Sequence, residues 1–98
     1  MTPAPGKKPL FRFKLYVAGD APNSAHASAN LTALCRTYLA DRHVIEIVNV
    51  FQDPTRALAD GIIMTPTLLK LAPLPVRKIV GTLSRTEPVL RALGLENP

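Results

Sequence analysis

The sequence has few of the residues on which many chemical functions depend. It contains one cysteine, no tryptophan and only 5% aromatic residues in 98 positions. A lone Cys35 excludes an intramolecular disulfide and a metal site built from cysteines. The apolar runs are too short to cross a bilayer, so we expect no membrane association. Neither a P-loop nor a GxGxxG pattern occurs, and the sequence therefore predicts no cofactor.

The length and composition predict one folded domain. Hydrophobic residues make up 47% of the chain, and 12 Lys+Arg against 7 Asp+Glu give a formal charge of +5. Residues 1–9 hold three prolines, a glycine and two lysines, which predicts a flexible tail before a single domain at residues 10–95. Because no signal-peptide apolar segment follows the lysines, we expect a cytoplasmic location.

Hydrophobic periodicity predicts alternating strands and helices. Strands are expected at residues 10–17, 44–50, 68–71 and 76–81, the second with both faces partly covered. Helices are expected from a cap at Asn23 or Ser24 to about residue 39, at residues 55–60, and at residues 84–93 with Ser84 or Thr86 as the cap. Arg77 and Lys78 favour an edge position for the last strand.

This order, βαβαββα, predicts the thioredoxin-like α/β fold, with a mixed four-stranded sheet flanked by helices. The first three elements form a parallel unit, and an antiparallel hairpin follows. Redox proteins of this fold need a thiolate where the first strand meets the first helix, but residues 18–24 contain no cysteine. Cys35 lies on the apolar stripe of the first helix, which favours a buried side chain. We therefore expect no enzyme.

The other candidates for chemistry have simpler interpretations. His26 and His43 have no serine, cysteine or carboxylate beside them in a recognised arrangement. The aspartates at turns and helix ends, among them Asp53 and Asp60, are explained by local capping. The Thr65–Pro66 bond can be cis or trans, and the sequence leaves both open.

Basic residues are the remaining signal. Lys14, Arg77 and Lys78 lie on predicted strands, where Arg12 and Lys70 join them. Sheets that bind RNA need exposed aromatic side chains for base stacking, and this chain has few. A moderate basic excess instead favours an acidic protein surface as the partner, so we expect no nucleic acid.

Several segments resemble the KaiB family of clock proteins. KLYVAGDAPNS at residues 14–24 resembles the family pattern KLYVAGxxPNS. TPTL at residues 65–68 and PLPVRKIVG at residues 73–81 resemble the family's ATPTL and LPxPVRRIIG stretches. The spacing between these segments agrees as well, and the resemblance extends over about residues 10–93.

The resemblance implies a regulatory protein that binds a KaiC-type ATPase. In cyanobacterial clocks, the bound form then captures KaiA or a related histidine kinase. Some members rest as a tetramer with a rearranged second half and convert to a thioredoxin-like monomer that binds KaiC. The alternative is a thioredoxin-like adaptor or stress-response protein of a non-clock KaiB-like branch.

Two features favour the thioredoxin-like form over the rearranged tetramer as the resting state. Ala92 stands where fold-switching relatives have glycine, which favours a helix by about 1 kcal/mol. Gly94 follows at the position where a helix ends in the left-handed conformation. We therefore expect a helix at residues 85–93, and a monomer or dimer.

The predicted partner-binding surface combines charge with apolar contacts. Lys14, Arg77 and Lys78 match basic positions of the family pattern, and we expect them on one face. The apolar contacts predicted beside them are Ile62, Ile63 and Pro66.

Overall fold

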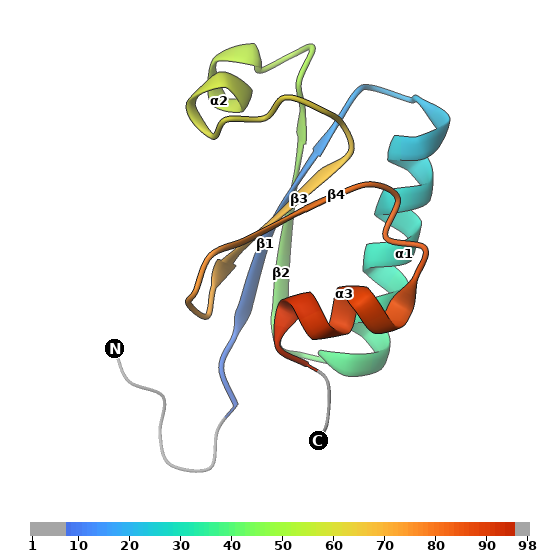
Figure 1. The fold of residues 1–98 in the computed structure, drawn as a ribbon, viewed down its shortest axis with the longest axis vertical. Helices are drawn as coiled ribbons and strands as arrows, with labels where there is room; N and C mark the ends of the chain where they lie inside the picture. Colours follow the sequence, from blue (N-terminus) through green and yellow to red (C-terminus); the bar gives the residue numbers. More distant parts are fainter. Residues whose placement is uncertain (1–7, 96–98) are drawn as a thin grey trace.

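The computed structural model describes residues 8–95, which fold in the predicted order βαβαββα (Figure 1). The strands are β1 (Phe11–Val17), β2 (His43–Asn49), β3 (Thr67–Ala72) and β4 (Arg77–Val80), and the helices are α1 (Pro22–Tyr38), α2 (Pro54–Ala59) and α3 (Thr86–Leu93). The thioredoxin-like class is confirmed. The tail predicted at residues 1–9 lies outside the described residues except for its last two positions. No helix within residues 8–95 is long and apolar enough to cross a membrane.

The sheet is mixed and has the strand order β2-β1-β3-β4. β1 pairs in parallel with β2, while the β1–β3 and β3–β4 pairs are antiparallel. The predicted edge position of β4 is confirmed. β2 forms the other edge, and both its faces are partly covered, as predicted. Val48 is buried, but Val44 and Ile47 are about half exposed because the two cores centre on β1 and β3.

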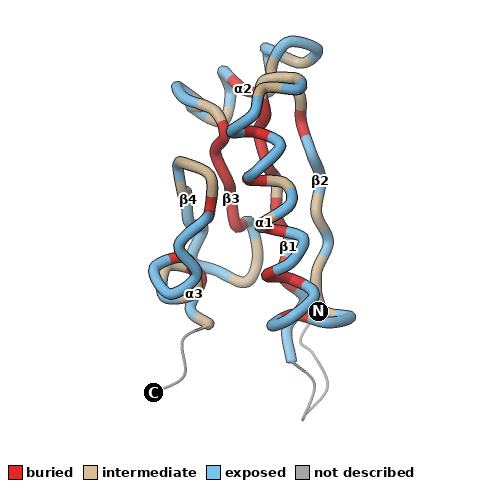
Figure 2. The backbone as a smooth tube through the Cα atoms, turned by 90° about the vertical axis from the view of Figure 1, so that its right-hand side faces the viewer, coloured by how far each residue is buried: buried red, intermediate tan, exposed pale blue. Residues whose placement is uncertain are grey.

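Two hydrophobic cores lie on opposite faces of the sheet. On one face, alternate residues of β1 such as Phe13 and Leu15 pack with Leu31 of α1 and Leu93 of α3. On the other face, a smaller core joins four residues of β1, β2, α2 and β3: Tyr16, Val48, Ala57 and Leu69. In Figure 2, the buried positions follow β1, β3 and the inner side of α1. The sheet thus has an α1/α3 side and an α2 side.

The side-chain caps expected at the helix starts are absent. α1 begins at Pro22 without a side-chain cap, and Ser24 lies inside the first turn. Asp53 precedes α2, but its carboxylate makes no capping bond. Both helices begin with proline, whose fixed φ suits the first helical position whether or not a side chain caps the helix.

The third helix ends as predicted but begins differently. Arg85 precedes it, and neither Ser84 nor Thr86 makes a capping bond. Gly94 ends the helix with a φ of 77°, a left-handed conformation that glycine adopts without a steric penalty. The helix expected at residues 85–93 is therefore confirmed with its C-terminal stop.

Candidate docking surface

The junction of β1 and α1 carries hydrogen-bond acceptors in place of a redox group. The Ser24 hydroxyl accepts a hydrogen bond from the Ala18 N–H at 3.0 Å. The Asn49 side-chain oxygen accepts from the N–H groups of Gly19, at 3.2 Å, and Phe51, at 3.0 Å. These bonds satisfy the backbone N–H groups of Ala18, Gly19 and Phe51 with side-chain oxygens.

The thiol of the chain lies away from that junction. Cys35 is fully buried on α1, and burial raises its pKa to about 11. His26 is exposed, while the Nδ1 of His43 lies 2.8 Å from the Leu39 carbonyl oxygen. Within residues 8–95, no three His, Cys, Asp or Glu side chains are placed to hold a metal ion. Nothing in this region resembles a nucleophile with its base.

A polar cluster on the α2 side joins the end of α2 to β1. Asp60 accepts hydrogen bonds from the Tyr16 hydroxyl and, at 3.0 Å, from the Lys14 ammonium. These two donors lower the pKa of Asp60. Burial, followed by the Asp60 hydrogen bond, raises the pKa of Tyr16 to about 12. The local capping role predicted for Asp60 is therefore wrong, because its carboxylate reaches across to the sheet.

A second link joins α2 to β2. Both guanidinium nitrogens of Arg56 contact the Glu46 carboxylate at 2.8 Å, and Arg56 also lies 3.6 Å from Asp53. The hydrogen bond from Arg56 lowers the pKa of Glu46. This pair is exposed and adds little stability by itself, but a bidentate contact fixes the orientation of α2.

An apolar hollow opens beside α2, between the loop that follows this helix and β4. Its volume is about 190 Å³, and it is lined by Gly61, Ile62, Ile63, Met64, Thr67, Lys78 and Val80. Ile63 is 94% exposed and Met64 62% exposed. The Lys78 ammonium donates to the Gly61 carbonyl oxygen at 3.3 Å, which places a charge at the rim. Exposed apolar side chains around a hollow with a charged rim are typical of a protein docking site.

Strand register places two of the predicted basic residues on the same face. Lys14 of β1 lies opposite Leu69 of β3, and Leu69 lies opposite Lys78 of β4, so all three share the α2 side. Ile62 packs against the core on this side, and Ile63 lines the same hollow. We call Lys14, Ile62, Ile63, Met64 and Lys78 the α2-side surface.

The other two predicted residues lie elsewhere. Arg77 is opposite Lys70, which is opposite Phe13, so Arg77 belongs to the α1/α3 side. The expectation that Lys14, Arg77 and Lys78 share one face is therefore wrong, because consecutive strand residues point to opposite faces. Pro66 is buried after a cis bond from Thr65 and offers little surface for contact.

Sequence reasoning missed the residues that hold this surface in place. Tyr16 alternates with the apolar residues of β1, a position typical of the polar side, yet it is fully buried, and its hydroxyl donates to Asp60. No sequence pattern distinguishes Arg56 from the other surface arginines, yet it joins α2 to Glu46. Tyr16 itself is the signal that could have indicated this cluster. A buried tyrosine needs a hydrogen-bond partner for its hydroxyl, and a polar residue of a nearby helix can supply one.

The fold and the junction define a class of protein: a thioredoxin-like domain with no thiol at the thioredoxin position. The N-terminal domain of SasA from Synechococcus elongatus superimposes with a TM-score of 0.73 at 18% identity, covering 100% of this chain and 95% of that one. Mitochondrial thioredoxin 3 of Saccharomyces cerevisiae gives a TM-score of 0.66 at 18% identity, covering 91% of this chain and 79% of that one.

The sequence defines the family more narrowly. The KaiB domain model matches residues 14–95, and the chain belongs to the KaiB family. The circadian clock protein KaiB3 of Synechocystis is 41% identical over 83 residues, which are 85% of this chain and 79% of that protein. The circadian clock oscillator protein KaiB of Picosynechococcus is 43% identical over 88 residues, covering 90% and 85%. The resemblance drawn from the motifs is confirmed.

Proposed function

We propose that this chain is a clock-type regulatory protein that docks on a KaiC-type ATPase through the α2-side surface. It acts by binding and not by catalysis. Membership of the KaiB family and the names of the curated relatives support the timing role. Recruitment of a KaiA-type protein or a histidine kinase to the resulting complex belongs to the same proposal.

The observation that carries the choice of surface is the exposure of Ile63 and Met64 beside Lys78. A large apolar side chain that is 94% exposed loses its contact with water when a partner covers it. Lys78 stands at the rim, where a charge acts mainly on the association rate. Lys14 is already paired with Asp60, so we assign it a role in holding α2 and the hollow in place.

Binding kinetics with a KaiC-type ATPase from the same organism test the proposal. We expect Ile63→Ser to weaken binding about tenfold or more, mainly through faster dissociation, as truncation of a central apolar contact does. Lys78→Glu should slow association and reduce its salt dependence.

Matched controls come from other exposed positions. Leu58→Ser changes an equally exposed apolar side chain of α2 outside the hollow, and Arg36→Glu reverses a charge on α1. Both should bind as the unchanged protein does. The choice of surface is wrong if Ile63→Ser binds normally while folded, or if Leu58→Ser is equally impaired. Failure of the unchanged protein to bind the ATPase would reject the function itself.

A further inference from the structure

Lys70 is the charged side chain that the proposed function leaves unexplained. It lies on β3 on the α1/α3 side and is only 4% exposed. Its ammonium lies 5.8 Å from the centre of the Phe11 ring. Within residues 8–95, it takes part in no hydrogen bond and no ion pair. Lysine is rarely this buried unless it is paired, which points to an acceptor from outside the described residues.

The nearest charge makes this arrangement worse. Arg77 of β4 lies directly opposite Lys70 in the strand register. Like charges directly opposite each other destabilise a sheet. Burial, followed by the charge of Arg77, lowers the pKa of Lys70. Arg77 is exposed, so its guanidinium is open to a ligand.

None of the ion pairs within the described residues includes Lys70 or Arg77, and Glu87 of α3 pairs with neither of these cations. The ion pairs within the described residues join Asp60, Glu46 and Asp53 to Lys14 or Arg56, all on or beside the α2 side. Nothing comparable reaches the α1/α3 side next to β3 and β4. The two cations there therefore lack a counter-charge within the described part of the chain.

The Lys70 ammonium can still be reached from solvent. No buried side-chain nitrogen or oxygen within residues 8–95 is left without a partner. Since the Lys70 nitrogen has no hydrogen bond, it must be the part of this side chain that meets the surface. Phe11 forms an apolar wall beside it.

We propose that Lys70 and Arg77 form a binding site for a phosphate-type dianion. A phosphate group carries about −1.5 to −2 charges near pH 7, which balances two cations, whereas a carboxylate balances one. The flat guanidinium of Arg77 suits paired hydrogen bonds to phosphate oxygens, and the Lys70 ammonium supplies a compact second charge. Bound phosphate would relieve the repulsion between the two side chains. The site lies on the face opposite the α2-side surface and does not depend on the proposed docking function.

Titration of the full chain with inorganic phosphate tests this site. The lysine Hε–Cε NMR signals report the Lys70 environment directly, and sodium chloride at equal ionic strength corrects for screening. We expect a saturable shift of the Lys70 signal and an increase in its titration midpoint on binding. Methyl phosphate should bind as well, and its failure to do so would restrict the site to free phosphate.

The phosphate affinities of three variants distinguish a specific site from a generally basic surface. Arg77→Gln should weaken phosphate binding about tenfold, because it removes charge-assisted hydrogen bonds. Lys70→Met should abolish phosphate binding, because it removes the ammonium. The unbranched methionine side chain fills the space of the lysine stem. Lys78 follows Arg77 in β4 but points to the opposite face. Lys78→Gln should therefore change the phosphate affinity by less than about twofold.

Three results would overturn the proposal. The first is a phosphate response no larger than that of chloride. The second is acetate binding as tightly as phosphate, because the proposal requires a ligand with about two negative charges and acetate carries only one. The third is an equal loss in Lys78→Gln and Arg77→Gln. If Lys70→Met does not fold, the exposed Arg77→Gln variant still decides the question.

Discussion

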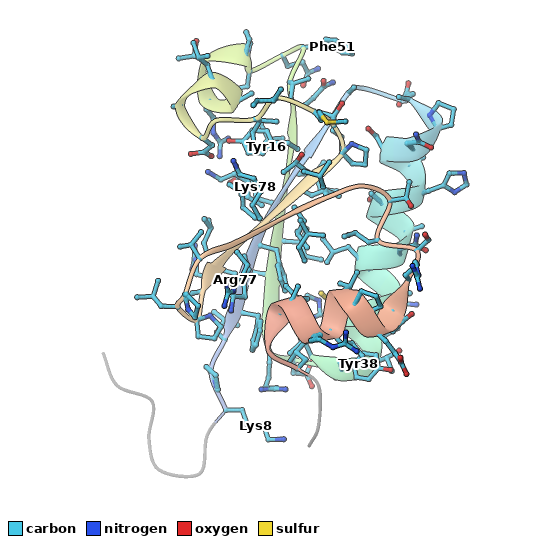
Figure 3. The ribbon with its side chains drawn as sticks, in the orientation of Figure 1. Lys8, Tyr16, Tyr38, Phe51, Arg77 and Lys78 are labelled. Atoms are coloured by element: carbon cyan, nitrogen blue, oxygen red, sulfur yellow. The ribbon has the colours of Figure 1, made fainter. Side chains whose placement is uncertain are left out.

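Removing the hydroxyl of Tyr16 tests how α2 is held on the sheet. Tyr16 lies next to α2 (Figure 3). It is fully buried, and its hydroxyl donates to Asp60 at the end of α2. Burial and this hydrogen bond raise the pKa of Tyr16 to about 12, from 10.0. The folded state therefore keeps the proton at a pH where the unfolded chain has lost it. The resulting stability is fully present below about pH 10 and is lost as the pH rises towards 12.

The size of this loss follows from the shift. One pKa unit corresponds to about 1.4 kcal/mol, so a shift of about two units predicts a loss of roughly 2 kcal/mol by pH 12. For a domain of this size, about 1 kcal/mol moves the melting temperature by roughly 4–8 °C. The effect is large against a typical total stability of about 5–15 kcal/mol.

Urea unfolding of the unchanged protein and of Tyr16→Phe, from pH 8 to 12, measures the effect. The difference in unfolding free energy between the two should be nearly constant up to about pH 10 and then fall by roughly 2 kcal/mol by pH 12. Deprotonation of lysines occurs in both proteins and cancels in the difference. In Tyr38→Phe, Tyr16 is the only tyrosine left, so its ionisation can be followed by absorbance.

Two outcomes would refute this reasoning. One is ionisation of Tyr16 near pH 10 in the folded Tyr38→Phe protein. The other is a difference between the unchanged protein and Tyr16→Phe that stays constant up to pH 12. Tyr38→Phe serves as the control for stability as well, because Tyr38 is exposed and lies at the end of α1 far from α2 (Figure 3).

Two further predictions concern Cys35 and Gly94. The Cys35 thiol should react with a disulfide reagent at pH 8 only after unfolding, because it is buried and its pKa is raised to about 11. For the same reason, the folded protein should not reduce insulin. Insulin reduction that persists in Cys35→Ser would contradict the absence of redox activity. Gly94→Ala should lower the unfolding free energy by about 1 kcal/mol, because Gly94 has a φ of 77° and a side chain there meets no neighbour. An unchanged urea midpoint would show that α3 does not need its left-handed end.

The fold could be predicted because its signals are local. Alternation in β1, the helical stripe of α1 and the glycine that ends α3 each act within a few residues. The order of the elements then restricts the sheet to few topologies. The helix starts were predicted less well, because neither α1 nor α2 makes the side-chain cap that its sequence offers.

The polar cluster under α2 could not be predicted in the same way. Lys14 and Asp60 are 46 residues apart, and Tyr16 and Asp60 are 44 apart. No local pattern links residues at such separations, and a capping aspartate and a bridging aspartate look alike in sequence. Only the placement of α2 over β1 distinguishes them.

Arg77 and Lys78 show what the sequence already implied about the two faces. They are consecutive residues of one strand, so period-2 geometry alone requires that they point to opposite faces. Lys78 then meets the hollow beside α2, and Arg77 meets Lys70. A double charge reversal at these positions would therefore disturb two surfaces at once. The single variants separate them: Lys78→Gln should keep phosphate binding, and Arg77→Gln should keep docking on the ATPase. If each single variant impaired both, the two sides of β4 would act as one surface, and the division drawn from the strand register would be wrong.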